Sequence, residues 1–327
     1  MIAQACGICA NREGNQLHTV KEMMFGFRDE FEYLECGDCG CLQISHVPEK
    51  LSKYYPPTYG AFNQPDAQLL REASSWIRFL RRQMTSYVLH RRNLIGRFGV
   101  ILRPRISSEF SWLRRTGVIL NSRILDVGCG SGSLVLRLHQ LGFSNLIGVD
   151  PFIRNEVVYR DVRILKRELA EVEGGFDLVM LHHSLEHIPN HRAAFCQLLR
   201  ILNPNGYVLI RTPVFGTAAW RHYGVNWVQL DAPRHLVLHS VKSMRVLAAK
   251  SGFEIVDVEF DSTGFQFVGS EQYLRNIPLT DERSHWAHPK DASVFSKGEI
   301  EGFENQARIL NENADGDQAA FYLRRNR

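Results

Sequence analysis

The feature that most constrains this chain is a glycine-rich turn at residues 124–133, with the sequence Ile-Leu-Asp-Val-Gly-Cys-Gly-Ser-Gly-Ser. An apolar run enters the turn and a helix-compatible run leaves it, so the segment predicts a buried strand, a turn and a helix. Gly128, Gly130 and Gly132 allow backbone dihedrals that other residues avoid and let a ligand approach the peptide groups. We therefore expect a nucleotide-type ligand at this turn.

A carboxylate follows the next expected strand at the separation that such a site needs. The apolar segment 146–149 ends in Asp150, twenty residues beyond Gly130, where a carboxylate can accept hydrogen bonds from both hydroxyls of a ribose. The glycine spacing is G-x-G-x-G with an aspartate two positions ahead, whereas dinucleotide-binding turns have G-x-G-x-x-G. The run resembles motif I of the class I S-adenosylmethionine (SAM)-dependent methyltransferases. That resemblance implies SAM contacts at Asp126, Gly128, Gly130, Gly132, Asp150 and, as an adenine contact, Glu168.

Strands and helices alternate from residue 121 onward. Strand-like segments lie at 123–127, 145–149, 162–165, 176–181, 207–211, 252–260 and 318–325. This order predicts an α/β fold, a doubly wound, Rossmann-like seven-stranded sheet. The methyltransferase resemblance implies that the last strand lies antiparallel beside the fifth. The stretch 261–317 exceeds ordinary loop length, so we expect a helical insertion there.

Length and composition set the expected domain plan. The 327 residues exceed the usual size of one domain, and we expect a small module at 1–45, a linker and basic helical segment at 46–120, and a SAM-dependent methyltransferase domain at 121–327. No run approaches the roughly 18 apolar residues of a membrane-spanning helix. The N-terminus lacks the regions of a secretory signal, so we expect a cytoplasmic protein.

Five of the seven cysteines lie within the first 41 residues. Cys6 with Cys9 and Cys36 with Cys39 form two C-x-x-C pairs, each with a glycine after its first cysteine, which is the spacing of structural zinc ligands. In a reducing compartment such cysteines are more often metal ligands than disulfides. The pattern predicts a zinc-ribbon-like module that holds one structural Zn²⁺, with Cys41 as a spare or substitute ligand.

The segment 71–115 is strongly basic. Its eleven arginines and two glutamates give a net charge of +9, whereas the whole chain carries +4. Apolar side chains stand between the arginines at helical spacing. Three interpretations stay open. The helices could pack on the core with arginines reaching water, form a surface for an anionic membrane face or a phosphate-bearing substrate, or contact nucleic acid.

Candidate catalytic residues follow the fourth and fifth expected strands, at the sheet edge where doubly wound folds bind ligands. Three histidines and a glutamate stand within 182–187, and a further histidine closes the segment 231–235. Methyl transfer from a sulfonium needs an aligned nucleophile first and a base second, and imidazole can accept a hydroxyl proton. We expect His187 or His182 as the base, with His235 next and His182 also as a cofactor contact. The competing interpretation is that these histidines only orient their loop.

Longer motifs resemble the methyltransferases of bacterial surface-polysaccharide and sugar-modifying pathways. These motifs are LDVGCGSG, FDLVMLHHSLEHIPN, LNPNGYVLIRTP and DAPRHLVLHS. The front end, CGDCGCLQ followed by YYPPTY, is similar to the zinc-binding module that precedes sugar C-methyltransferases acting on deoxysugar nucleotides. The resemblance implies a SAM-dependent methyltransferase whose acceptor is a sugar, a sugar nucleotide or a lipid-linked glycan. Those C-methyltransferases carry a further C-terminal domain for which 327 residues leave no room, so we expect O-methylation.

Two alternatives stay open for the function. An RNA methyltransferase would use the arginine-rich segment for phosphate contacts, and a non-catalytic SAM-binding protein would keep the glycine turn without turnover. The intact glycine turn and the polar loop after the fourth strand favour an enzyme.

Overall fold

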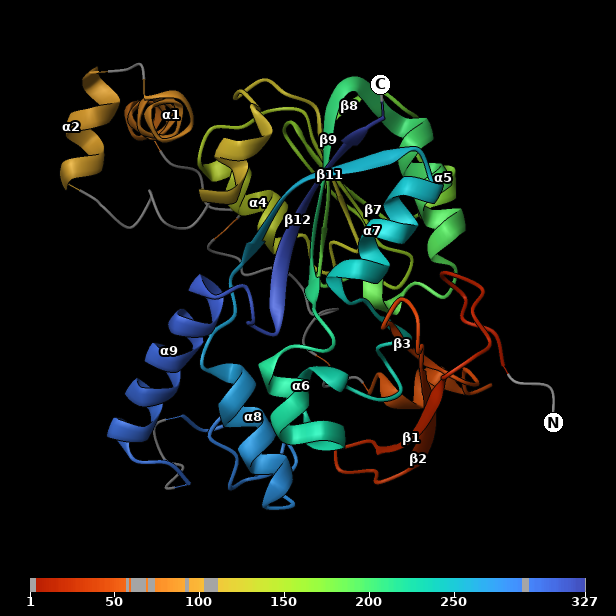
Figure 1. The fold of residues 1–327 in the computed structure, drawn as a ribbon. Helices are drawn as coiled ribbons and strands as arrows, with labels where there is room; N and C mark the ends of the chain where they lie inside the picture. The colour runs from red at the N-terminus through yellow and green to blue at the C-terminus, as the bar shows by residue number, and fades with distance from the viewer. Residues whose placement is uncertain are drawn as a thin grey trace.

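Two β-sheets organise the chain in the computed structural model (Figure 1). The structure describes residues 4–56, 59, 69, 74–91, 94–102, 111–289 and 294–326. The larger sheet has eight strands in the order β11-β12-β9-β8-β4-β5-β7-β6. Its strands are β4 (Ile124–Val127), β5 (Leu146–Val149), β6 (Val157–Tyr159), β7 (Val162–Leu165), β8 (Phe176–His182), β9 (Leu202–Pro213), β11 (Phe253–Phe260) and β12 (Gln318–Arg325).

The register of the central strands places the loops of the expected site side by side. β4 pairs in parallel with β5 and β8, and Val127 lies opposite Val149. The glycine turn and Asp150 therefore leave the sheet at the same level. β8 is parallel to β9, with His182 opposite Arg211. β12 lies antiparallel between β9 and β11, as the resemblance implied.

The sheet has one strand more than the seven expected. The additional strand β6 pairs antiparallel with β7 at the sheet edge. Arg160, in the tight turn between these strands, has a left-handed φ of 53°. Such turns usually carry glycine or asparagine, so the Arg-Asp pair at this turn gave no hairpin signal in the sequence.

Helices cover both faces of the large sheet. One face packs against α5 (His191–Ile201) and α7 (Val241–Lys250), whose inward residues include Phe195 and Leu247. The other face packs against α4 (Ser133–Gln140), the end of α1 (Ser75–His90) and the 3₁₀ segment η3 (Ser111–Thr116). α2 (Leu94–Leu102) lies against α1 on the side away from the sheet (Figure 1).

The smaller sheet joins the N-terminal residues to a late segment of the chain. Its order is β1 (Gln16–Lys21), β2 (Glu30–Glu35), β3 (Leu42–Ile44) and β10 (Val237–Leu238). Tyr33 and Leu42 of this sheet share a core with Trp227 and Phe267, which belong to the C-terminal half of the chain. Three helices, α6 (Ala218–Tyr223), α8 (Phe265–Leu274) and α9 (Lys297–Glu312), follow one another away from this sheet in the view of Figure 1, with α6 nearest to it. Short 3₁₀ turns complete the fold at Leu51–Tyr54, Leu169–Glu171, Leu185–His187, Gly224–Asn226 and Val228–Leu230.

The helices of the described ranges include none with the length and apolar character needed to cross a bilayer.

Candidate active site

The glycine turn after β4 is in direct contact with the loop after β8. Gly128 has a φ of 71°, and a Cβ on it would lie 2.4 Å from the Cβ of Ser184. The Ser184 hydroxyl donates a hydrogen bond of 2.7 Å to the carbonyl of Val127. Any larger residue at Gly128 would push the two loops apart, so the chain's own packing demands a glycine here in addition to its backbone conformation.

Gly132 is held by a similar constraint at the start of α4. Its φ is 76°, and a Cβ there would lie 2.0 Å from Cδ1 of Ile164 on β7. Gly132 therefore lets α4 begin directly above β7. Ligand approach is one reason for a glycine at these positions, and close packing between neighbouring elements is a second.

Two buried carboxyl groups flank the glycine turn. Asp150 Oδ2 accepts a hydrogen bond of 3.0 Å from the Gly130 N–H, and Oδ1 accepts one of 2.8 Å from the Phe152 N–H. Asp126 Oδ1 has no hydrogen-bond partner among the described residues. Burial, with the nearby Asp150 charge second, raises the pKa of Asp126 to about 8. A cationic or hydrogen-donating ligand group would satisfy this orphaned oxygen.

Two other expected cofactor contacts lie at or just after the ends of β7 and β8. Glu168 is exposed after β7, and its N–H donates a hydrogen bond of 2.8 Å to the side chain of Glu171. His182 ends β8 with its ring centroid 4.7 Å from that of Trp112. Burial, followed by Arg211 and His183, lowers the pKa of His182 well below its usual range, so its ring is neutral.

The loop after β8 and the segment after α6 bring one carboxylate and two imidazoles together. The ligand atoms of Glu186, His187 and His235 all lie within 4.8 Å of one another. The rings of His187 and His235 meet edge to face, with centroids 4.8 Å apart. His182, the other expected base, is not a member of this trio.

Backbone carbonyl groups determine which ring nitrogen of His187 and of His235 carries the proton. His187 Nδ1 lies 2.9 Å from the carbonyl oxygen of Arg234, and His235 Nδ1 lies 2.7 Å from that of Gln229. A carbonyl oxygen only accepts, so each Nδ1 carries the proton of the neutral ring and each Nε2 keeps its lone pair. The tautomers follow from these contacts, and both Nε2 atoms can accept a proton or bind a cation.

The surroundings of the trio favour a neutral His187 and an ionised Glu186. Burial, with His235 second, lowers the pKa of His187 to about 4, so the ring is neutral near pH 7. Burial opposes ionisation of Glu186, but the neighbouring His183, His235 and His187 outweigh it and lower its pKa to about 2. Glu186 Oε2 accepts a hydrogen bond of 2.9 Å from Thr212, while Oε1 has no such partner among the described residues. One carboxylate with two imidazoles is also a donor set that can hold a divalent cation.

The N-terminal residues reach this cluster directly. The hydroxyl of Tyr55 lies 3.2 Å from His187 Nδ1. Arg234, next to His235, donates to Glu22 at 2.9 Å, to Asp231 at 2.7 Å and to the Tyr54 carbonyl at 3.0 Å.

Sequence reasoning assigned no role to Tyr55, Glu22 or Arg234. Tyr55 and Arg234 stood within quoted motifs, YYPPTY and DAPRHLVLHS. Their partners lie far away in the chain, and the motifs alone could not pair them.

Four of the N-terminal cysteines form a cluster of their own. The sulfur atoms of Cys6, Cys9, Cys36 and Cys39 lie within 4.8 Å of one another, whereas the edge of a zinc–tetrathiolate tetrahedron is about 3.8 Å. The N–H groups of Ile8 and Cys9 donate to the Cys6 sulfur at 3.4 and 3.5 Å. The sulfur of Cys41 also lies 3.4 Å from that of Cys6.

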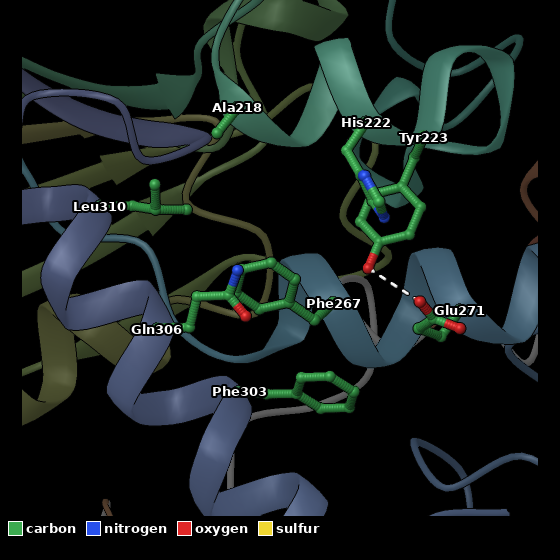
Figure 2. A pocket seen from close by; sticks show the side chains of 8 residues that line it. All are labelled: Ala218, His222, Tyr223, Phe267, Glu271, Phe303, Gln306 and Leu310. Carbon is green, nitrogen blue, oxygen red and sulfur yellow. Dashed lines mark hydrogen bonds between the residues drawn. The ribbon is translucent and has the colours of Figure 1, made fainter.

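A separate cavity lies between α6, α8 and α9 (Figure 2). Its volume is about 290 Å³, and the hydroxyl of Tyr223 donates a hydrogen bond of 3.1 Å to Glu271 at its wall. The lining residues are Ala218, His222, Tyr223, Phe267, Glu271, Phe303, Gln306 and Leu310. This set shares no member with the trio around His187 or with the glycine turn.

Comparison with known proteins decides the family. The profile of a family described as a methyltransferase domain matches residues 80–258, more than half of the chain. The chain belongs to this methyltransferase family. The matched domain includes both the glycine turn after β4 and the loop after β8.

Curated relatives of the methyltransferase match over part of their length. A ubiquinone biosynthesis O-methyltransferase from Dechloromonas aromatica (strain RCB) is 30% identical over 118 residues, which cover 32% of this chain and 50% of the relative. A tRNA U34 carboxymethyltransferase from Alcanivorax borkumensis is 32% identical over 121 residues, which cover 30% of this chain and 38% of the relative. The chain thus spans half or less of the length of these relatives.

Two solved structures are similar to parts of this chain. A SAM-dependent methyltransferase from Mesorhizobium loti is 18% identical, with a TM-score of 0.41, over 66% of this chain and 97% of the other. A cyclopropane synthase from Mycobacterium tuberculosis is 15% identical, with a TM-score of 0.42, over 80% of this chain and 98% of the other.

Proposed function

We propose that this methyltransferase transfers the methyl group of SAM to a hydroxyl oxygen of a sugar or glycan intermediate. One observation carries the proposal: the loop that contacts the glycine turn through Ser184 also carries His187, whose Nε2 is free of its own proton. The proposed donor site and a proton acceptor thus stand on touching loops at the same edge of the sheet. The name of the ubiquinone O-methyltransferase relatives supports transfer to oxygen.

The residues around the glycine turn fit SAM. We assign its ribose hydroxyls to Asp150, and its remaining polar groups to Asp126 and the peptide groups of Gly128, Gly130 and Gly132, with Glu168 and His182 at the margin. Bound SAM supplies a methyl group on a sulfonium that leaves as a neutral thioether. Asp126 suits the cationic part of such a ligand because its buried Oδ1 has no partner among the described residues.

His187 serves as the proton acceptor in this mechanism. Its neutral Nε2 takes the hydroxyl proton of the acceptor as the oxygen attacks the methyl carbon. The carboxylate of Glu186 favours the charged imidazolium that results, and His235 is the second acceptor in the cluster. The hydrogen bond from Nδ1 to the Arg234 carbonyl keeps the ring oriented during this transfer.

Aromatic and acidic groups support a sugar as the acceptor. The rings of Tyr55 and Tyr59 meet edge to face, with centroids 5.1 Å apart, next to His187. Burial raises the pKa of both phenols, with a further increase from Asp231 and Glu186 nearby. Aromatic rings with carboxylates nearby suit a ligand with both C–H faces and hydroxyls.

We also propose one structural Zn²⁺ at Cys6, Cys9, Cys36 and Cys39. Four thiolates leave no position open for chemistry, so this metal would act through folding of the N-terminal strands. The two N–H···S bonds to Cys6 stabilise the thiolate that zinc requires.

Methyl transfer from isotopically labelled SAM to a panel of acceptors tests the function. The panel contains sugar nucleotides, lipid-linked sugars and bulk RNA, and we expect label on a sugar oxygen. His187→Ala should lower kcat by about a hundredfold to ten-thousandfold while SAM affinity stays nearly unchanged, whereas the exposed His46→Ala should change neither. Full turnover in His187→Ala and His235→Ala would place the base elsewhere. Label on RNA would establish the alternative acceptor.

A chelator separates the two roles that the trio can play. A proton-accepting His187 predicts that turnover survives a chelator that leaves the cysteine cluster loaded. Loss of turnover under that condition, restored by a divalent cation, would make Glu186, His187 and His235 metal ligands instead.

A further inference from the structure

Helices α1 and α2 form a hairpin with an exposed apolar surface. The exposed fractions of its large apolar side chains are 66% for Trp76, 72% for Leu94, 52% for Ile95, 67% for Phe98 and 66% for Ile101. Isolated exposed apolar residues are common on proteins, but five on two adjacent helices form a surface that water solvates poorly.

Two glycines explain why these side chains face outward. α2 packs on α1 through Gly96 and Gly99, where a Cβ would lie 2.1 Å from the Gln83 carbonyl oxygen and 2.6 Å from Met84 Cγ. The small residues of α2 thus occupy the contact with α1, and Gly96 is buried there. Leu94, Phe98 and Ile101 point away from α1 and stay exposed.

The hairpin is anchored to the body of the protein, and the outer side chains that the structure describes are exposed. On α1, Arg82 donates a hydrogen bond of 2.6 Å to the Gly142 carbonyl, and Thr85 donates one of 2.8 Å to the Leu141 carbonyl. Val88 and Leu89 of α1 are buried. α1 therefore positions α2 on the outside of the molecule (Figure 1).

All the formally charged side chains of the hairpin are positive. Residues 74–102 contain six arginines and no aspartate, glutamate or lysine. Guanidinium groups bind phosphates, and aromatic and aliphatic side chains enter the boundary between headgroups and acyl chains. A polynucleotide would use the arginines but would leave exposed leucine, isoleucine and phenylalanine side chains in water.

We propose that the α1–α2 hairpin docks the protein on an anionic phospholipid surface. Phe98, Leu94 and Ile101 enter the interface, and Arg78 and Arg97 contact the headgroup phosphates. The hairpin belongs to the same face of the fold as α4, whose N-terminus follows the glycine turn. The proposal does not depend on which acceptor the active site takes.

Sedimentation of the full-length protein with vesicles tests this docking. We expect binding to vesicles of phosphatidylserine and phosphatidylcholine in equal amounts, weaker binding to pure phosphatidylcholine, and weakening by salt. Leu94→Ser/Phe98→Ser should reduce vesicle affinity by about tenfold or more, because two apolar side chains no longer enter the bilayer. Arg78→Gln/Arg97→Gln should reduce affinity for anionic vesicles alone. The control is Leu17→Ser, which removes a 62% exposed leucine from β1 and should not change binding.

Further measurements distinguish lipid binding from binding of RNA or of a second copy of the chain at the hairpin. Each variant should bind SAM as the wild type does, since Leu94, Arg97 and Phe98 are exposed and Arg78 is only half-buried. The proposal would be overturned if the wild-type protein did not sediment with anionic vesicles. It would also be overturned if single-stranded RNA bound through the arginines and vesicles did not, or if sedimentation equilibrium showed a dimer that Leu94→Ser/Phe98→Ser dissolves without any vesicle binding.

Discussion

Arg234 and Glu22 form an ion pair of 2.9 Å in which both side chains are fully buried. The guanidinium also holds both carboxylate oxygens of Asp231, at 2.7 and 3.0 Å. Glu22 precedes β2, whereas Arg234 stands beside His235 of the histidine cluster. The pair therefore ties the N-terminal strands to the loop that carries His235.

Removal of the Arg234 side chain should lower the free energy of unfolding strongly. Arg234→Met leaves Glu22 and Asp231 as buried carboxylates without their cation, and we expect a loss of about 3–5 kcal/mol in the free energy of unfolding. Arg308→Met breaks an exposed pair with Glu312 on α9 and should cost less than about 1 kcal/mol. Urea denaturation measures both. Equal losses in the two variants would show that the buried pair adds nothing.

Asp150 should control SAM affinity. Asp150→Ala removes the carboxylate that we assign to the ribose, and each lost charge-assisted hydrogen bond is worth about 1.5–3 kcal/mol, so affinity should fall at least tenfold. Calorimetric titration with SAM gives the constant, with the exposed Asp161→Ala as control. Because Asp150 also accepts two backbone N–H groups, the thermal midpoint is measured in parallel. Unchanged SAM affinity in a folded Asp150→Ala protein would refute the assignment.

Zinc removal should affect the N-terminal strands first. We expect one Zn²⁺ per chain by elemental analysis of protein purified without chelator, and none in Cys6→Ser/Cys36→Ser. Limited proteolysis should then cut within the first 45 residues while SAM still binds, because a segment this small lacks a core of its own. Turnover should fall as well, since β3 pairs with β10, which follows His235. The exposed Cys196→Ser should retain metal and activity; metal-free wild-type protein would contradict the site.

The buried histidine pair of α5 and the segment after β10 should make stability depend on pH. His191 Nδ1 lies 2.8 Å from His239 Nε2, and burial lowers the pKa of His191 to about 4. The unfolded chain takes up this proton near pH 6.5, so the contribution of His191 is complete above about pH 6.5 and is lost as the pH falls toward about 4. Over that window the loss should be about 3 kcal/mol.

Urea denaturation of wild type and His191→Gln across this range measures the effect. The difference in unfolding free energy between the two proteins should stay constant above about pH 7 and shrink below about pH 6. A difference that does not change with pH would mean that His191 takes up its proton equally in both states.

Local sequence determined the central strand–turn–helix unit of the fold. Glycines at fixed spacing, an apolar strand before them and Asp150 after the next strand specify a strand–turn–helix unit, because backbone freedom and side-chain period act over a few residues. The same holds for the two C-x-x-C pairs. The edge strand β6 was not predicted, because the turn after it carries Arg160 rather than glycine at the left-handed position.

Tertiary structure alone decided which residues meet. The contact of His187 with His235 and Tyr55, the pair of Arg234 with Glu22 and the outward face of α2 all join segments distant in sequence or depend on packing between helices. A residue pattern carries no record of such partners, because the energy of each contact exists only once the sheets and helices have packed. The sequence by itself determined the strand, the glycine turn and the carboxylate that follows the next strand, and tertiary packing decided that His187 and His235 meet near the loop that contacts this turn through Ser184.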